Sequence, residues 1–267
     1  MLKEIVIAIQ SYREAHRFIS RHRLWKWILI PGFLYTIMFI AGIWLFWVTS
    51  TEATQLLLNK TGIKEWLENL KNGWMNFLVI ICQIIIWMVT LMFYFSLFKF
   101  IFLIIGSPLF SYLSEKTDAI LTGKDFPFSL SKLMKDAWRA IKIAIRNILW
   151  QSLYMISLFL LSLIPLFGWV TPVVGLLVEF YYLGFSMLDY SSERNNLSAS
   201  QSIQFIGRHK GLAIGNGLVF YLMHLLPVIG WLLAPSYAVI AATLSLHKAR
   251  NEKIIIGSMD SIALNNE

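Results

Sequence analysis

Long apolar runs separated by short polar segments dominate the sequence. Residues 24–49 are almost entirely apolar, and at about 1.5 Å per helical residue they reach about 39 Å, enough for a tilted membrane crossing. Residues 76–105 form a second apolar run that reaches about 45 Å and exceeds a hydrocarbon core of roughly 30 Å. We therefore predict one long transmembrane helix for each run.

Amphipathic segments lie beside these runs. In residues 1–22, mainly apolar and aromatic residues recur at steps of three and four, while arginines occupy another face. The first set is Ile5, Ile9, Tyr12, His16 and Ile19, and the second is Arg13, Arg17 and Arg21. This pattern predicts an amphipathic helix that lies on the membrane surface. Residues 51–75 mix apolar and charged positions and are predicted to be interfacial.

Two similar turns divide the C-terminal half of the chain. Pro165–Pro172 and Pro227–Pro235 each contain a Pro-x-x-Gly-Trp sequence between apolar arms, which indicates two helical hairpins, residues 148–190 and 211–247. The four arms are residues 148–164, 173–190, 211–226 and 236–246. Their helical lengths of about 25, 27, 24 and 16 Å favour hemi-penetrating hairpins, which enter the bilayer only partway. Six full crossings are the competing topology.

A basic stripe precedes the first hairpin. After Gly106-Ser107-Pro108 the chain turns polar, and residues 107–147 are predicted to form helices on the cytoplasmic side. Five cations share one helix face there at steps of three and four, namely Lys132, Lys135, Arg139, Lys142 and Arg146. Such a stripe indicates contact with anionic lipid headgroups or with water at the cytoplasmic surface.

Composition supports an all-α integral membrane protein. The 267 residues are 57% hydrophobic and only 14% charged, with a mean hydropathy of +0.64, which leaves too little polar surface for a soluble domain. One cysteine, Cys82, excludes an internal disulfide and a cysteine-based metal cluster. The sequence has no His-Glu-x-x-His, phosphate-loop or nucleophile-elbow motif, so we expect neither an enzyme nor a metal or cofactor site. The net charge of +8 is spread over several loops, which gives little support to nucleic-acid binding.

Lysines and arginines are distributed unevenly along the chain. Most of the 23 lie in the N-terminal segment, in residues 106–147 and 191–211, and after residue 246. The predicted topology places all these segments on one side of the membrane. By the positive-inside rule that side is the cytoplasm, so we predict that both termini are cytoplasmic.

Two ionisable residues, Lys99 and Glu179, fall inside apolar runs. A charge in hydrocarbon costs at least about 2.5–3.5 kcal/mol unless it is paired or hydrated, so each is a candidate functional residue. Lys99 lies near the end of its run, and its ammonium could instead extend to the cytoplasmic headgroups. Glu179 is deeper in its arm. We expect it to line a pore or an oligomer interface, with Lys99 as its hypothetical partner.

Several short motifs carry a family resemblance. They are Leu29-Ile30-Pro31, Gly106-Ser107-Pro108-Leu109, Leu113-Ser114-Glu115-Lys116, Leu121-Thr122-Gly123, Ile164-Pro165-Leu166-Phe167-Gly168, Asp189-Tyr190, Leu226-Pro227 and Ala234-Pro235. In order and spacing they resemble the CysZ-type sulfate permeases and the broader etoposide-induced membrane protein family. The resemblance implies two long transmembrane helices, two partly inserted hairpins, and an oligomeric sulfate permease of the bacterial inner membrane.

The sulfate site of these permeases resembles a Gly-hydrophobic-Arg-Arg turn just before the first span. In this chain the turn aligns with Arg23-Leu24-Trp25-Lys26, so Arg23 replaces the glycine and Trp25 replaces the first arginine. Oxyanions bind backbone N–H groups at a helix N-terminus together with flanking cations. The candidate substrate-binding residues are therefore Arg21, His22, Arg23, Leu24 and Lys26. The alternative is that these cations form an ordinary positive-inside anchor.

Two functions are compatible with these patterns. The first is a permease for a small inorganic oxyanion, most simply sulfate, acting as an oligomeric channel or as an ion-coupled transporter. The second is a non-transporting membrane protein that binds anionic lipid and organises or bends the bilayer through its hairpins and basic stripe. Selective anion flux through the purified protein distinguishes the two.

Overall fold

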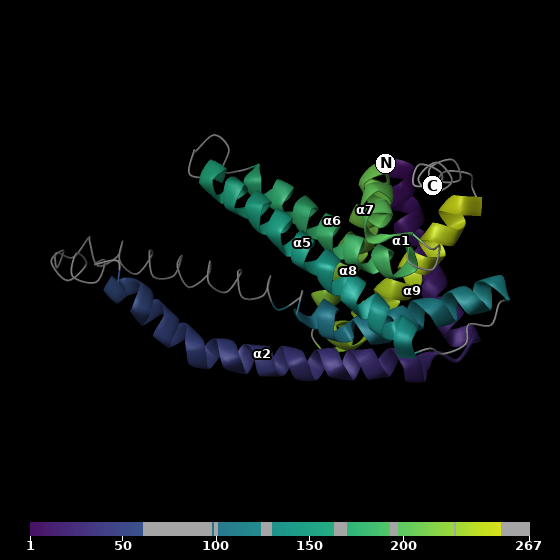
Figure 1. Cartoon of the computed structure of the whole chain (residues 1–267), viewed down its shortest axis with the longest axis horizontal. Coiled ribbons are helices and arrows are strands. Elements are labelled where there is room, and N and C mark those ends of the chain that lie inside the picture. The colour runs from purple at the N-terminus through teal and green to yellow at the C-terminus, as the bar shows by residue number, and fades with distance from the viewer. Residues whose placement is uncertain are drawn as a thin grey trace. The chain divides into compact units, whose positions relative to one another are not determined.

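The described part of the protein is entirely helical (Figure 1). The computed structural model describes residues 1–60, 98, 101–123, 130–162, 170–192, 197–226 and 228–251. These residues divide into two compact units, the first formed by Met1–Thr36 and Leu103–Glu267 and the second by Ile37–Phe102. The all-α prediction is confirmed. Most of the second predicted transmembrane run, residues 76–105, lies outside the described residues.

The first predicted transmembrane helix is longer than expected. Helix α2, Trp25–Lys60, continues through residues 51–60, where we expected an interfacial segment. Its sequence there, Thr-Glu-Ala-Thr-Gln-Leu-Leu-Leu-Asn-Lys, contains no glycine or proline that would end a helix. In the second unit, Phe39 of α2 stacks edge to face on Phe98, with ring centroids 5.8 Å apart.

Helix α9, Ile229–Asn251, forms the centre of the first unit. Every residue from Ala234 to Leu246 is buried, and α9 contacts α1, α6 and α8. The helix begins before Pro235, whereas we expected an arm of residues 236–246. Its 23 residues reach about 35 Å, so the short arm length derived from the sequence was an underestimate.

Helices α6, Thr171–Ser192, and α8, Lys210–His224, pack closely through glycines. A Cβ atom on Gly184 would collide with the backbone of Ala213, and one on Gly217 would collide with the backbone of Phe180. Small residues that allow two backbones to approach are typical of helix pairs in membranes, where tight packing replaces the hydrophobic effect.

Helix α1, Leu2–Arg21, packs on α8 and α9. Its buried face combines small and large side chains, namely Glu4, Ile7, Ala8, Ser11, Tyr12, Ala15 and Ile19. The face predicted from large apolar residues is buried only in part, since Tyr12 and Ile19 are buried, whereas Ile9 is 40% exposed and His16 is also exposed. The helix and its amphipathic character are as expected. Its buried face, however, contacts protein.

Two helix boundaries expected from the sequence are absent. Helix α5, Leu130–Ser162, is continuous through residue 147, where we expected the cytoplasmic helices to end and the first hairpin to begin. Residues 101–122 also form one continuous helix through Gly106-Ser107-Pro108, and it ends at Gly123, whose φ of +68° suits glycine. The remaining helix, α7, Ala199–Arg208, begins with a capping box between Ser198 and Gln201.

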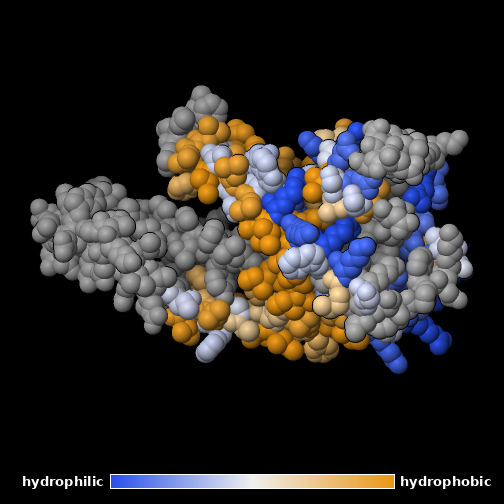
Figure 2. Space-filling model, viewed as in Figure 1, coloured by the Kyte–Doolittle hydropathy of each residue, from blue (hydrophilic) through white to orange (hydrophobic). Residues whose placement is uncertain are grey.

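Four described segments are long and apolar enough to cross a membrane. They are Trp25–Thr49, Trp138–Leu161, Thr171–Ser192 and Ile229–Asn251. Apolar residues cover the outer ends of α5 and α6 (Figure 2), where Leu153, Phe159 and Val173 are each at least half exposed. Exposed apolar surface of this kind suits contact with lipid.

Candidate functional site

The turn between α1 and α2 is the first candidate site. Helix α1 ends at Arg21, and Arg23 has a φ of +53°, a left-handed conformation that usually requires glycine. The Leu24 N–H donates to the Ile19 carbonyl at 3.1 Å, which closes a Schellman-type helix end. Arg23 therefore holds a left-handed conformation at the position where the resembled Gly-hydrophobic-Arg-Arg turn has its glycine, at a cost of about 1–2 kcal/mol for a side chain there.

Helix α2 begins directly after this turn. The N–H groups of Trp27 and Ile28 both donate to the Leu24 carbonyl, at 2.9 and 3.2 Å. The N–H groups of Trp25 and Lys26 come earlier and have no backbone acceptor within the described residues. Unpaired first-turn N–H groups and the positive end of the helix dipole together favour an anion.

The predicted substrate-binding residues have two different roles in this turn. Arg21, Arg23 and Lys26 are exposed, so their charges are accessible to an anion. His22 is exposed as well, and its ring lies 4.6 Å from that of Phe18. Leu24 is only 2% exposed, so it anchors the turn in the core and offers an anion no side-chain contact.

Trp25 and Trp27, on both sides of Lys26, contact two basic side chains, His16 and Lys116, that were not predicted as part of this site. The His16 ring lies 6.3 Å from that of Trp25, and the His16 Nδ1 is 2.8 Å from the Tyr237 hydroxyl. Lys116 places its Nζ 4.5 Å from the centre of the Trp27 ring. The Trp-Lys-Trp sequence at the start of an apolar run was the available signal, but only the fold reveals the partners.

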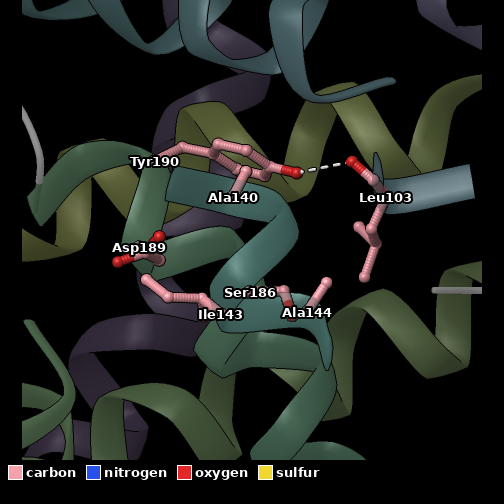
Figure 3. A pocket seen from close by; sticks show the side chains of 7 residues that line it. All are labelled: Leu103, Ala140, Ile143, Ala144, Ser186, Asp189 and Tyr190. Atoms are coloured by element: carbon pink, nitrogen blue, oxygen red, sulfur yellow. Dashed lines mark hydrogen bonds between the residues drawn. The ribbon is translucent and has the colours of Figure 1, made fainter. Parts of the chain in front are cut away.

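A second candidate site is the seam between α5 and α6. Arg139 Nη2 lies 2.8 Å from Asp189 Oδ1, with both side chains at most 13% exposed, and the Ser202 hydroxyl donates to the same oxygen at 2.5 Å. Beside this ion pair is a pocket about the size of one water molecule (Figure 3). Its lining residues are Leu103, Ala140, Ile143, Ala144, Ser186, Asp189 and Tyr190, and Figure 3 shows the Tyr190 hydroxyl donating to the Leu103 carbonyl.

The seam also contains Glu179. Gln151 Nε2 donates to Glu179 Oε2 at 2.5 Å, and one turn earlier on α5 the Arg146 guanidinium donates to Asn147 Oδ1 at 3.0 Å. Asn147 Nδ2 and Gln151 Oε1 are buried and have no hydrogen-bond partner in the part of the chain that the structure describes. Buried polar atoms of this kind are usually met by water. Lys99, the hypothetical partner of Glu179, lies outside the described residues.

The predicted lipid-binding stripe separates into parts with different surroundings. Lys135 and Lys142 are exposed, whereas Arg139 is held by Asp189 and is therefore less available to lipid than expected. Arg146 is half-buried and lies 5.8 Å from the Phe185 ring. The Lys132 side chain lies outside the described residues. Periodicity alone could not separate the paired arginine from the exposed lysines.

Outside these two sites, a buried glutamate occupies the start of α8. The Gly211 N–H donates to Glu4 Oε2 at 3.1 Å, and His209 Nδ1 lies 2.8 Å from Glu4 Oε1. Nearby, the Tyr12 hydroxyl donates to Asn216 Oδ1 at 2.8 Å. Burial raises the pKa of Tyr12 well above its usual value, so the phenol stays protonated and keeps this role. No group of three His, Cys, Asp or Glu side chains suited to a metal occurs among the described residues.

The helices and their apolar lengths define an all-α, multi-pass membrane protein. Residues 11–235 match the family described as sulfate transporter CysZ/etoposide-induced protein 2.4, and the chain belongs to this family. The family is one of transporters, and the protein is accordingly not classed with enzymes.

Curated relatives give the same family assignment. The sulfate transporter CysZ of Pseudomonas fluorescens strain Pf0-1 is 25% identical over 253 residues, which cover 92% of this chain and 95% of the relative. The sulfate transporter CysZ of Pseudomonas syringae pv. tomato strain DC3000 is 28% identical over 174 residues, covering 64% and 68%. That of Pseudomonas aeruginosa strain LESB58 is 25% identical over 189 residues, covering 68% and 75%.

Proposed function

We propose that this protein is a membrane permease for a small inorganic oxyanion, with sulfate as the substrate. Family membership and the names of the relatives support the class of substrate. The observation that carries the proposal for this chain is the start of α2, where two N–H groups with no backbone acceptor among the described residues lie beside the exposed cations Arg23 and Lys26. Sulfate is a dianion with four acceptor oxygens, so it can use both kinds of group at once.

The altered turn changes how an oxyanion is held. Lysine is a compact point charge, whereas arginine offers a planar fork that binds two oxygens together. With Lys26 and Trp25 in place of two arginines, attraction depends more on charge and on the backbone N–H groups than on bidentate geometry. We therefore expect affinity to fall with rising salt concentration.

The arrangement in the membrane is part of the proposal. Both termini lie in the cytoplasm and the protein resides in the bacterial inner membrane as a homo-oligomer, with hairpins 148–190 and 211–247 entering the bilayer only partway. Helices α6 and α9 are longer than the arms predicted from sequence, so accessibility of single cysteines along them to an external thiol reagent tests their depth. Labelling from both sides of the membrane would support full crossings instead.

Glu179 is proposed to line the hydrated path or the oligomer interface. Its contact with Gln151, beside two buried amide atoms with no described partner, supports a polar route along the α5–α6 seam. A charge exchange tests the hypothetical pair. Glu179→Lys and Lys99→Glu should each reduce flux, and the double variant should recover it. Failure of the double variant to recover flux or folding would remove Lys99 as the partner.

The second candidate function is a lipid-binding protein that organises the bilayer. The exposed lysines 135 and 142 and the apolar outer ends of α5 and α6 support it, because they suit anionic headgroups and acyl chains. It predicts vesicle binding or deformation without anion flux.

Radiolabelled sulfate uptake into proteoliposomes tests the proposal. Wild-type protein should give saturable uptake that exceeds the uptake of empty liposomes and is inhibited more by unlabelled sulfate than by chloride. The variant Arg23→Ala/Lys26→Ala should lose most of this uptake. A matched control, Arg13→Ala/Arg17→Ala, removes two exposed cations from α1 and should keep it. If folded wild-type protein shows no sulfate uptake, the lipid-binding function is the remaining candidate.

A further inference from the structure

Lys116, from helix 101–122, is brought to the start of α2 by an aromatic pair. The Trp27 and Tyr112 rings lie 4.8 Å apart, and the Lys116 Nζ is 4.5 Å from the centre of the first ring and 5.9 Å from that of the second. Both distances fall within the range of cation–π attraction. Two segments about 90 positions apart in the sequence therefore meet through one ammonium group.

The geometry of a helix directs this contact toward the candidate anion site. Trp27 is the third residue of α2. Every Cα–Cβ bond in a helix tilts toward the N-terminus, so a side chain covers the turn before its own Cα. The Trp27 ring consequently lies toward the N–H groups of Trp25 and Lys26, and the Lys116 ammonium is held on this ring.

The charge of Lys116 is not neutralised by the acidic groups nearest to it in sequence. Asp118 is paired with His247, whose Nε2 lies 2.6 Å from Asp118 Oδ1. Glu115 is the adjacent residue, and neighbours in a helix sequence do not face each other. Within the described residues, Lys116 Nζ has no acceptor oxygen at hydrogen-bonding distance, and its ring contacts leave N–H donors of the ammonium available.

We propose that Lys116 is a further substrate-binding residue, supplying a second lysine charge to the oxyanion held at the start of α2. This rests on the proposed function and deepens it. Trp25 stands where the resembled motif has its first arginine, and Lys116 restores a cation from another helix. Because attraction to a dianion is twice that to a monovalent anion at equal distance, Lys116 favours divalent oxyanions.

Lys116→Ala tests the assignment in sulfate uptake by the full-length protein. We expect the KM for sulfate to rise about tenfold with the maximal rate within about twofold, because a charged contact to substrate is lost while the fold is kept. Inhibition by chloride should change much less than competition by unlabelled sulfate. Lys116→Arg should restore the KM to within about threefold, since arginine also stacks on tryptophan and stays charged.

Lys210→Ala is the matched control. Lys210 is an exposed lysine at the start of α8, where Glu4 already accepts the Gly211 N–H, so the KM of Lys210→Ala should equal the wild-type value. A normal KM in Lys116→Ala, or an equal rise in Lys210→Ala, would overturn the role of Lys116 while leaving the permease proposal intact. A wild-type protein without saturable uptake would overturn both. Equal thermal unfolding of the two lysine variants and wild type verifies that the fold is retained.

Discussion

The starts of helices α2 and α8 both carry first-turn N–H groups at the positive end of a helix dipole, but their surroundings differ in charge. At α8 the protein supplies its own anion, because Glu4 accepts the Gly211 N–H and contacts His209, and both side chains are about nine-tenths buried. At α2 no carboxylate contacts the first-turn N–H groups within the described residues, and exposed cations surround them. The comparison shows that the first-turn N–H groups of α8 already have an internal anion, whereas those of α2 have none among the described residues and are available to an external one.

The largest expected effect is the loss of the internal anion. Glu4→Ala leaves His209 and the Gly211 N–H without their carboxylate in a buried site, which should lower the free energy of unfolding by about 2–3 kcal/mol. Glu4→Gln keeps one acceptor oxygen and should cost less. Chemical unfolding in detergent measures both variants. Unchanged stability in Glu4→Ala would mean that the start of α8 does not need its anion.

A carboxylate introduced at the start of α2 should give this helix an internal anion, as Glu4 does for α8. Lys26→Glu removes a cation and places an acid in the first helical turn, so sulfate affinity should fall about thirtyfold through repulsion of the dianion. The same acid suits the helix dipole and should raise stability by roughly 0.3–1 kcal/mol. Equilibrium binding and unfolding measured on the same sample separate the two effects. If Lys26→Glu binds sulfate as tightly as wild type, sulfate does not bind at the start of α2.

The smallest effect comes from the strained residue of the turn. Arg23→Gly relieves a left-handed side-chain conformation, and we expect the protein to gain about 0.5–1 kcal/mol of stability. Loss of the cation should weaken sulfate binding about threefold. The control Arg23→Ala loses the same charge but keeps the strain, so it should weaken binding without gaining stability. Equal stability of the glycine and alanine variants would contradict the argument from strain.

The sequence predicted helix types and apolar runs better than it predicted helix ends. Pro235 and Ser107-Pro108 were interpreted as boundaries, yet each lies inside a continuous helix. Proline lacks one backbone donor and is tolerated where surrounding helices pack against it, and that packing is a tertiary property. Pro235 is buried within the core of the first unit, which accounts for its position in α9.

The buried face of α1 shows why periodicity gave only part of the answer there. Counting large apolar residues selected Ile9, which is exposed, and missed the small buried residues. At the contact with α8, Gly215 lies too close to Ala8 and to the backbone of Ile5 to admit a side chain. Short side chains carry little weight in hydropathy patterns, although they decide how near two backbones can lie.

The candidate anion turn could be proposed from sequence, because a family resemblance and a predicted helix start coincide at Arg23–Lys26. The conformation of this turn and its contacts could not be predicted from sequence. The φ of Arg23 and the approach of Lys116 to Trp27 depend on how α1, α2 and helix 101–122 pack together. The sequence shows which charged residues are present, but tertiary structure determines how they are arranged around the site.

Equilibrium binding of radiolabelled sulfate to the purified protein tests the central claim most directly. Wild type and Arg13→Ala/Arg17→Ala should bind sulfate saturably with the same Kd, and that Kd should rise with salt concentration. Arg23→Ala/Lys26→Ala should raise the Kd more than about tenfold, because two cations beside the first turn of α2 are removed. Equal sulfate binding by all three proteins would contradict an oxyanion site at the start of α2.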